Sequence, residues 1–195
     1  SLLCLFTYRP EFQPSWAEHA HLAHLDLRPL PPEDSEAMAT CVADMKTLPH
    51  EVVKLLVAKT GGIPLYIEEV TKAILETGQL REMEDRYELV GPMPSGVIPA
   101  TVQDSLMARL DRLGRSKPLA QLAATLGREF RYQVLRAVSH KNDQSLQADL
   151  ARLIDAELVF QTGSPPNSTY FFKHALIRDA AYASLLRKTR QQYHR

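Results

Sequence analysis

The chain has 195 residues, 45% of them hydrophobic and 24% charged, which suffices for one globular domain or two small ones. The 23 basic and 23 acidic residues balance, and this neutrality argues against a nucleic acid as the main partner, because phosphate binding requires clustered Lys and Arg. No stretch approaches the roughly 20 apolar residues of a membrane span, so we expect a cytoplasmic protein without membrane contact.

The first 30 residues predict strand and loop. Residues 2–8 are a continuous apolar run typical of a buried β-strand, and Leu25 and Leu27 alternate around Asp26 as in a short strand. A strand buried on both faces needs neighbours that this chain does not supply, so we expect it to be part of a longer protein. Cys4 and Cys41 lie in apolar runs without metal-type spacing and are expected to be buried free thiols.

Three helices are expected next. The first begins near Glu33, the second follows Pro49 and ends at Gly61-Gly62, and the third has Pro64 as its first residue and ends at Gly78. The apolar stripes expected to face the core are Met38, Cys41, Val42 and Met45, then Val52, Val53, Leu56 and Val57, then Ile63, Ile67, Val70 and Ile74. Residues 80–81 and 87–90 predict a small hairpin, and residues 91–99, rich in Pro and Gly, predict a linker.

The helical pattern restarts at residue 101. Thr101 and Asp104 form a capping box at the start of a helix with apolar residues at helical spacing. Further helices are expected at 118–126, 132–138, 143–157 and 174–187, with strands at 158–161 and 169–172. This order, in which helices are followed by a two-stranded wing and then by another helix, is typical of a winged helix. The predicted fold class is therefore mainly α (α+β), with a helical subdomain followed by a winged-helix domain.

The sequence lacks the elements of a self-sufficient ATPase. No glycine precedes a Lys-Ser or Lys-Thr pair, so there is no loop to hold phosphates. No apolar strand ends in an acidic residue that would hold magnesium. We therefore expect no catalytic residues and no enzymatic activity from this chain alone.

Four segments in order carry a family resemblance. They are residues 7–12 (Thr-Tyr-Arg-Pro-Glu-Phe), 59–69 (with Gly62-Ile63-Pro64), 98–106 and 172–182 (with Lys173-His174-Ala175). The chain resembles the signal-transduction ATPases with numerous domains, AAA-type modules found behind bacterial class III adenylate/guanylate cyclases and in large transcriptional regulators. The resemblance implies a remnant of the ATPase core at 1–30, a helical lid at 31–95 and a winged helix at 98–190.

The same resemblance implies a regulatory role. The chain would sense the nucleotide and control an attached output such as an adenylate/guanylate cyclase, and the parent protein would be the ATPase. ATP or ADP with Mg²⁺ would bind only in the full-length parent, with no cofactor and no metal in this chain alone. The implied partners are the rest of the ATPase core, the output domain and helical repeats.

Four residues are implied to contact the nucleotide. Arg9, at a strand end, would sense the terminal phosphate, and a surface arginine is the alternative. Gly62 and Pro64 match the lid motif near adenine, although they also fit a helix C-cap followed by an N1 proline. His174 matches the histidine of the Met-His-Asp motif that contacts the β-phosphate of ADP in related apoptosome and plant-resistance ATPases; the flanking Met and Asp are absent here. A histidine satisfied by nearby backbone is the alternative.

Other interpretations compete with this one. His19, His21 and His24 suggest a metal site, but no cysteine or carboxylate pair accompanies them. Glu68 and Glu69 suggest an acid–base pair, but adjacent helix positions diverge, so we expect a solvated face.

A winged helix suggests a DNA-binding regulator. The helix expected before the wing is acidic, and the wing loop at 162–168 has no basic residue, so we expect this domain to pack against the ATPase core instead. A structural adaptor is the third alternative. The acidic residues of that helix are Asp143, Asp149, Asp155 and Glu157, against Arg152.

Overall fold

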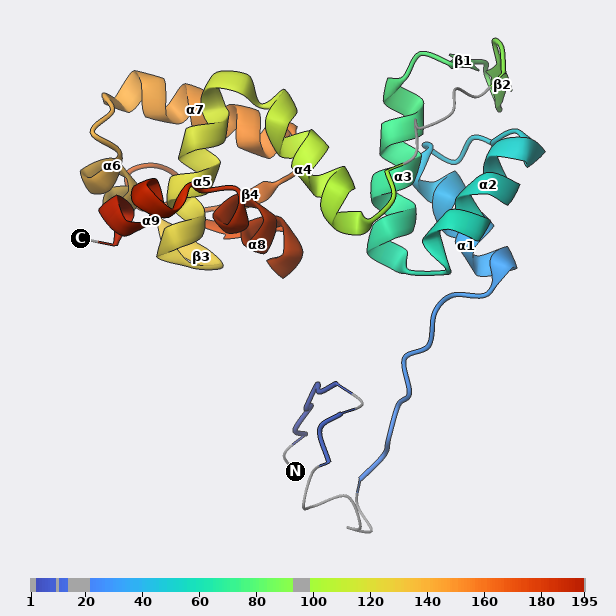
Figure 1. Ribbon diagram of the computed structural model, residues 1–195, viewed down its shortest axis with the longest axis horizontal. Helices are drawn as coiled ribbons and strands as arrows, with labels where there is room; N and C mark the ends of the chain where they lie inside the picture. The colour runs from blue at the N-terminus through green and yellow to red at the C-terminus, as the bar shows by residue number, and fades with distance from the viewer. Residues whose placement is uncertain (1–2, 10, 14–21, 93–98, 195) are drawn as a thin grey trace.

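The computed structural model describes residues 3–9, 11–13, 22–92 and 99–194. The described residues form nine α-helices and five short strands, so the predicted class, mainly α with small antiparallel sheets, is confirmed. Figure 1 shows two helical bodies side by side, with an extended segment before α1 that leads away from them.

The first body is a three-helix unit with a hairpin; it corresponds to the segment predicted as the helical lid, and we call it the lid below. Helix α2 ends in Gly61, whose left-handed backbone (φ 57°) caps it, and Pro64 is the first residue of α3, so both helix boundaries predicted from Gly and Pro are confirmed. Strands β1 and β2 pair antiparallel as the predicted hairpin. The elements are α1 (Pro32–Val42), α2 (His50–Thr60), α3 (Pro64–Glu76), β1 (Leu80–Glu82) and β2 (Tyr87–Leu89).

The buried face of α1 differs from the prediction. Cys41 and Met45 are exposed, whereas Ser35 and Ala39 are buried where α1 packs on α3. Cys41 lies within α1 but off the buried face, which Ser35 and Ala39 define at i, i+4 spacing. Met45 lies beyond the helix, which ends at Val42, and its backbone is left-handed (φ 62°), so helical spacing does not extend that far. The stripes predicted for α2 and α3 are buried except for Val57, which is partly buried, and Ile63, which is half-exposed.

The second body has winged-helix topology. After α4, the order is helix, strand, two helices and two strands, and the sheet order β3-β5-β4 is antiparallel throughout. The Thr101–Asp104 capping box is confirmed, because the Thr101 side chain accepts a hydrogen bond from the Asp104 N–H. The elements are α4 (Val102–Arg112), α5 (Lys117–Leu126), β3 (Glu129–Arg131), α6 (Tyr132–Ser139), α7 (Asp143–Asp155), β4 (Val159–Thr162), β5 (Thr169–Phe172), α8 (Ala175–Ala183) and α9 (Arg187–Tyr193).

Two details of this body were not predicted. Strand β3 has only three residues, too few for its exposed–buried–exposed alternation to predict a strand, and it pairs with β5. The single helix expected at 174–187 is instead α8 followed by α9, and Arg190 of α9 stacks over the ring of Tyr182 at 4.4 Å.

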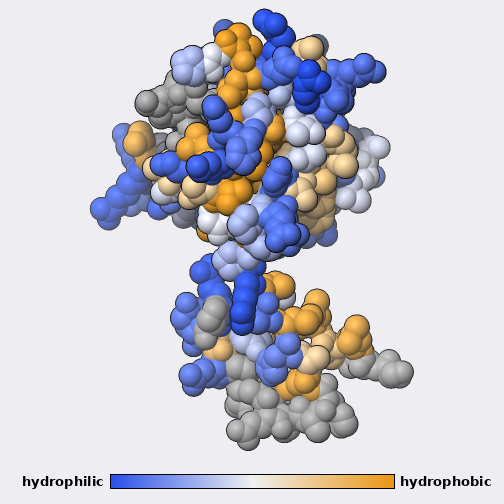
Figure 2. Space-filling view, turned by 90° about the vertical axis from the view of Figure 1, so that its right-hand side faces the viewer, coloured by the Kyte–Doolittle hydropathy of each residue, from blue (hydrophilic) through white to orange (hydrophobic). Residues whose placement is uncertain are grey.

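The segment before α1 contradicts the predicted strands. Residues 3–9 and 22–30 form no strand, and apolar side chains such as Leu3 (94%) and Leu5 (83%) are exposed, as are Leu25 and Leu27. Cys4 is exposed, as is Cys41 in α1, so the prediction of two buried thiols is wrong. The physical reason is that no other strand of the described residues lies beside this run. Figure 2 shows these apolar residues below the helical body.

The two bodies have separate cores. One consists of buried residues between Ala39 and Leu80, and the other of buried residues between Leu106 and Ala181. Val102, the first residue of α4, packs against both cores, so α4 is the element that joins the lid to the winged helix.

Candidate functional site

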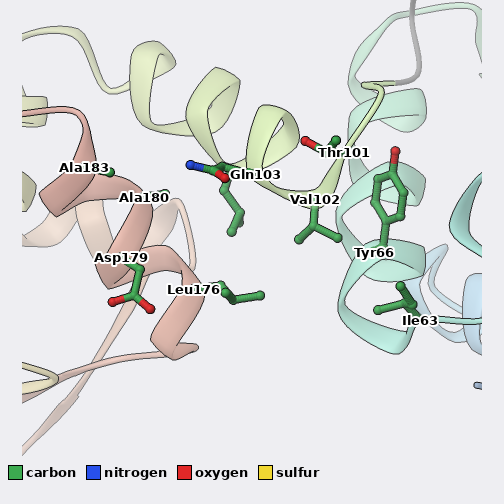
Figure 3. A pocket seen from close by; sticks show the side chains of 10 residues that line it. Ile63, Tyr66, Thr101, Val102, Gln103, Leu176, Asp179, Ala180 and Ala183 are labelled. Atoms are coloured by element: carbon green, nitrogen blue, oxygen red, sulfur yellow. The ribbon is translucent and has the colours of Figure 1, made fainter. Parts of the chain in front are cut away.

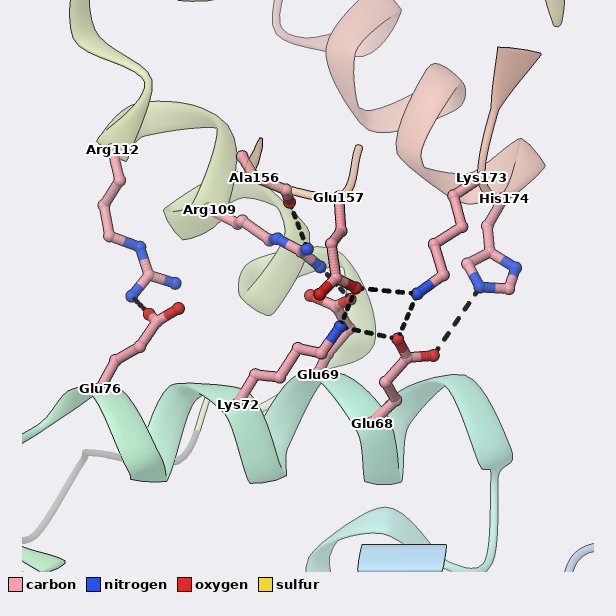
Figure 4. A network of polar contacts seen from close by, with 10 residues as sticks. All are labelled: Glu68, Glu69, Lys72, Glu76, Arg109, Arg112, Ala156, Glu157, Lys173 and His174. Atoms are coloured by element: carbon pink, nitrogen blue, oxygen red, sulfur yellow. Dashed lines mark hydrogen bonds and ion pairs between the residues drawn. The ribbon is translucent and has the colours of Figure 1, made fainter. Parts of the chain in front are cut away.

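Polar side chains of α3 meet the winged helix along one face. Glu68, Glu69, Lys72 and Glu76 project from α3 toward α4, the α7–β4 turn and the end of β5 (Figure 4). All four make ion pairs with residues of the winged-helix body, and Glu68 and Lys72 also pair with each other. We call this contact the lid–wing interface.

A buried ion pair lies at the centre of the lid–wing interface. Arg109 of α4 donates one guanidinium N–H to the carboxylate of Glu69 and another to the carbonyl of Ala156. Glu69 is 3% exposed, so the prediction that Glu68 and Glu69 form a solvated face is wrong. The reason is that α4 covers this face of α3, and burial of a charge requires a paired counter-charge.

A second cluster lies at the edge of the lid–wing interface. Lys173 donates to Glu68 (2.6 Å) and to Glu157 (3.0 Å), and Lys72 also donates to both carboxylates. Glu157 reaches them from a left-handed backbone conformation (φ 52°) in the α7–β4 turn. Four charged side chains from three parts of the fold are thus joined in one network.

The network changes the pKa values of its members. Hydrogen bonds from Lys72 and Lys173 lower the pKa of Glu157 to about 2. Burial raises the pKa of Glu68, but the hydrogen bonds from Lys173 and Lys72 outweigh it and the net shift is downward. Both carboxylates are therefore ionised at neutral pH.

Acid is expected to weaken the lid–wing interface. A carboxylate whose pKa is lowered by folding adds stability that is complete above its unfolded pKa, here 4.5, and is lost as the pH falls through its folded pKa, about 2 for Glu157. Urea unfolding of the wild type and of Glu157→Gln, from about pH 7 to about pH 2, measures this. The wild type should be more stable at neutral pH and lose most of that advantage in acid. An undiminished advantage at the acid end would contradict the assignment.

His174 lies between β5 and α8, next to the same network. Its Nε2 is 3.9 Å from Glu68 Oε2, too far for a hydrogen bond, and this buried nitrogen has no hydrogen-bond partner. The alternative prediction, that nearby backbone groups satisfy the His174 side chain, is therefore contradicted for Nε2. A buried polar atom without a partner is costly, so this nitrogen is available to a ligand.

An apolar cavity of about 500 Å³ lies where α3, α4 and α8 begin. Its size is within the range of small-molecule sites, roughly 300–1,000 Å³. Ile63 enters it from the lid and Leu176 from α8, on opposite sides (Figure 3). The other lining residues are Tyr66, Thr101, Val102, Gln103, Leu106, Asp179, Ala180 and Ala183.

None of the four residues implied to contact nucleotide is itself a lining residue of the cavity, but three of them are sequence neighbours of elements that line it. Gly62 and Pro64 flank Ile63, which lines the cavity from the lid, and His174 directly precedes α8, which lines it from the other side. Arg9 is exposed, in a segment that Figure 1 shows well away from the helices. Gly62 also has a local role, because its carbonyl accepts a hydrogen bond from the Leu30 N–H at 2.8 Å.

No metal site is found among the described residues, which contain no group of three or more His, Cys, Asp and Glu side chains that could hold an ion. His24 pairs its Nδ1 with the Tyr8 hydroxyl at 3.0 Å, and His19 and His21 lie outside the described residues. Within the same described ranges, no helix combines the length and the apolar character needed to cross a membrane.

Comparison with known proteins gives one informative match. The chain is 28% identical over 200 residues to the uncharacterized protein R02095 of Rhizobium meliloti (strain 1021). The match covers 100% of this chain and only 19% of the relative, so the chain corresponds to one part of a much larger protein. No family model matches the sequence, and no solved structure matches it.

Proposed function

We propose that this chain is the nucleotide-sensing, regulatory part of a larger signal-transduction ATPase that controls an attached output such as an adenylate/guanylate cyclase. The observation that carries the proposal is the cavity between lid and winged helix. It is lined by Ile63, which stands between Gly62 and Pro64 in the lid, and by Leu176 of α8, the helix that follows His174. The phosphate loop and the magnesium site would come from another part of the parent protein.

The residues present fit a nucleotide in two respects. The cavity is lined mainly by apolar side chains, which suits a flat base beside Ile63 and Tyr66. The buried His174 Nε2 without a partner suits a phosphate oxygen. Arg9 is not part of this arrangement, and its role as a phosphate sensor would require the segment before α1 to pack differently in the parent.

A ligand at this position would act on two bodies at once. Pro64 belongs to the lid and His174 to the winged helix, and the two bodies meet along the polar lid–wing interface. A ligand that contacts both bodies in one arrangement and not in another shifts the equilibrium toward the first. The lid and the winged helix would thereby convert nucleotide state into relative position.

The competing DNA-binding function has less support. Lys141, just before α7, and Arg152, within α7, both pair with Asp149, which also accepts a hydrogen bond from Ser116. Their charge is therefore already compensated within the domain, whereas DNA binding needs uncompensated positive potential.

Replacing His174 by alanine in the full-length parent tests the proposal. Loss of a hydrogen bond to a charged phosphate, about 1.5–3 kcal/mol, should reduce ADP affinity about 10- to 100-fold. The ADP retained by purified protein is measured by chromatography after denaturation. The control is His50→Ala, an exposed histidine at the start of α2. Equal ADP retention in both variants would refute the proposed role.

A further inference from the structure

The winged helix presents two adjacent nitrogen-bearing side chains to a single carboxylate of the lid. Lys173 Nζ lies 2.6 Å from Glu68 Oε1, and His174 Nε2 lies 3.9 Å from Glu68 Oε2 (Figure 4). We call Lys173 and His174 the basic pair. Glu68 thus occupies the position in which an anion would contact both members of the pair.

Glu68 satisfies the basic pair only in part. Its Oε1 accepts hydrogen bonds from both Lys72 and Lys173, whereas its Oε2 is too far from His174 to accept one. A carboxylate has two oxygens in one plane, while a phosphate has three or more around a tetrahedral centre and carries more charge. A phosphate could therefore bind Lys173 and His174 together, which Glu68 does not.

The network is also open enough for exchange. The side chains of Lys173 and His174 are 36% and 38% exposed, so an ion from solution can approach the basic pair. The His174 Nε2 itself is buried and becomes accessible when Glu68 moves away. Partly exposed ion pairs are weak, and a doubly charged anion competes well with a single carboxylate. By contrast, the Arg109–Glu69 pair is buried and closed to such competition.

We propose that Glu68 is a resting-state substitute for a phosphate group, and that a phosphate-bearing ligand displaces it from Lys173 and His174. Lys173 is then a second phosphate-binding side chain beside His174. The identity of this ligand as a nucleotide rests on the proposed function. Displacement breaks the contact between Lys173 and Glu68 at the edge of the lid–wing interface, while the Lys72–Glu157 pair and the buried Arg109–Glu69 pair persist, so the interface is loosened on the side of the basic pair.

The test measures pyrophosphate binding to the 195-residue chain by isothermal titration calorimetry at low ionic strength. Glu68→Gln removes the competing charge, so it should bind pyrophosphate on the order of tenfold more tightly than the wild type, as expected when a competitor that fills the site most of the time is removed. Adding Lys173→Gln to this variant should abolish the gain. The matched control is Glu76→Gln, which also removes an α3 carboxylate paired across the interface, with Arg112.

Equal pyrophosphate affinity in Glu68→Gln and Glu76→Gln would overturn the proposal. If circular dichroism shows that Glu68→Gln is unfolded, the variant Glu157→Gln is used instead, because it frees Lys173 from its other carboxylate. Tighter pyrophosphate binding by Glu157→Gln than by the wild type supports the proposal, and unchanged binding refutes it. These experiments involve neither ADP nor the parent protein. Their failure is therefore distinct from unchanged ADP retention in His174→Ala, which would refute the proposed function alone.

Discussion

Replacing Arg109 by alanine is expected to lower the free energy of unfolding by about 3–5 kcal/mol, because Glu69 would stay buried without its counter-charge. The Ala156 carbonyl would lose its guanidinium partner as well. Urea denaturation at neutral pH, followed by circular dichroism, measures the effect. A double replacement, Glu69→Leu with Arg109→Met, should recover most of the loss, because an apolar pair avoids the desolvation of two charges.

Arg112 provides the matched control for Arg109. It lies one turn further along α4 and pairs with Glu76, which belongs to α3 as Glu69 does. Both side chains of this pair are about half exposed, at 50% and 53%. Exposed pairs contribute roughly 0–1 kcal/mol, so Arg112→Ala should cost little. If Arg109→Ala cost no more than Arg112→Ala, the buried pair would not be what holds α3 against α4.

The boundaries of the helices could be predicted because their signals are local. A glycine in left-handed conformation ends α2, a proline begins α3, and a capping box begins α4; each involves residues within four positions of one another. The buried face of α1 was predicted incorrectly for the same reason. The apolar spacing in the sequence continues to Met45, which lies past the end of α1 at Val42, because local periodicity does not show where a helix ends.

The lid–wing interface could not be predicted, because its partners are distant in sequence. Arg109 and Glu69 are 40 residues apart, and Lys173 and Glu68 are 105 apart. One signal was present: Arg109 lies between Leu106 and Leu110 on the buried stripe of α4, where a charge requires a counter-charge. The sequence does not say which of the 23 acidic residues provides it.

The segment before α1 shows a different limit. Its apolar run predicts burial, but burial depends on what lies beside the run, and the described residues provide no neighbouring strand. The residue predicted to sense phosphate, Arg9, belongs to this segment, and it is the member of the predicted site that lies apart. Local sequence therefore does not determine where a predicted site residue such as Arg9 lies relative to the other residues of the site.

Replacing Gly62 by alanine is expected to release the chain before α1 from the lid. A Cβ at this position would lie 2.2 Å from the Leu30 carbonyl oxygen and 2.8 Å from the Leu30 nitrogen, so the backbone of one of the two must move. The left-handed conformation (φ 74°) adds strain of about 1–3 kcal/mol for a non-glycine residue. Urea unfolding should show a loss larger than this strain alone, and limited proteolysis should cut residues 22–30 faster.

Gly61→Ala separates the two causes. Gly61 is also left-handed (φ 57°), but a Cβ there meets nothing within 4 Å, so its replacement carries the backbone strain without the clash. The difference between the two variants therefore measures the contact between Leu30 and Gly62. Equal losses and equal cleavage would mean that Gly62 serves only the turn between α2 and α3. A larger loss in Gly62→Ala would mean that Gly62 also fixes where the segment before α1 leaves the lid.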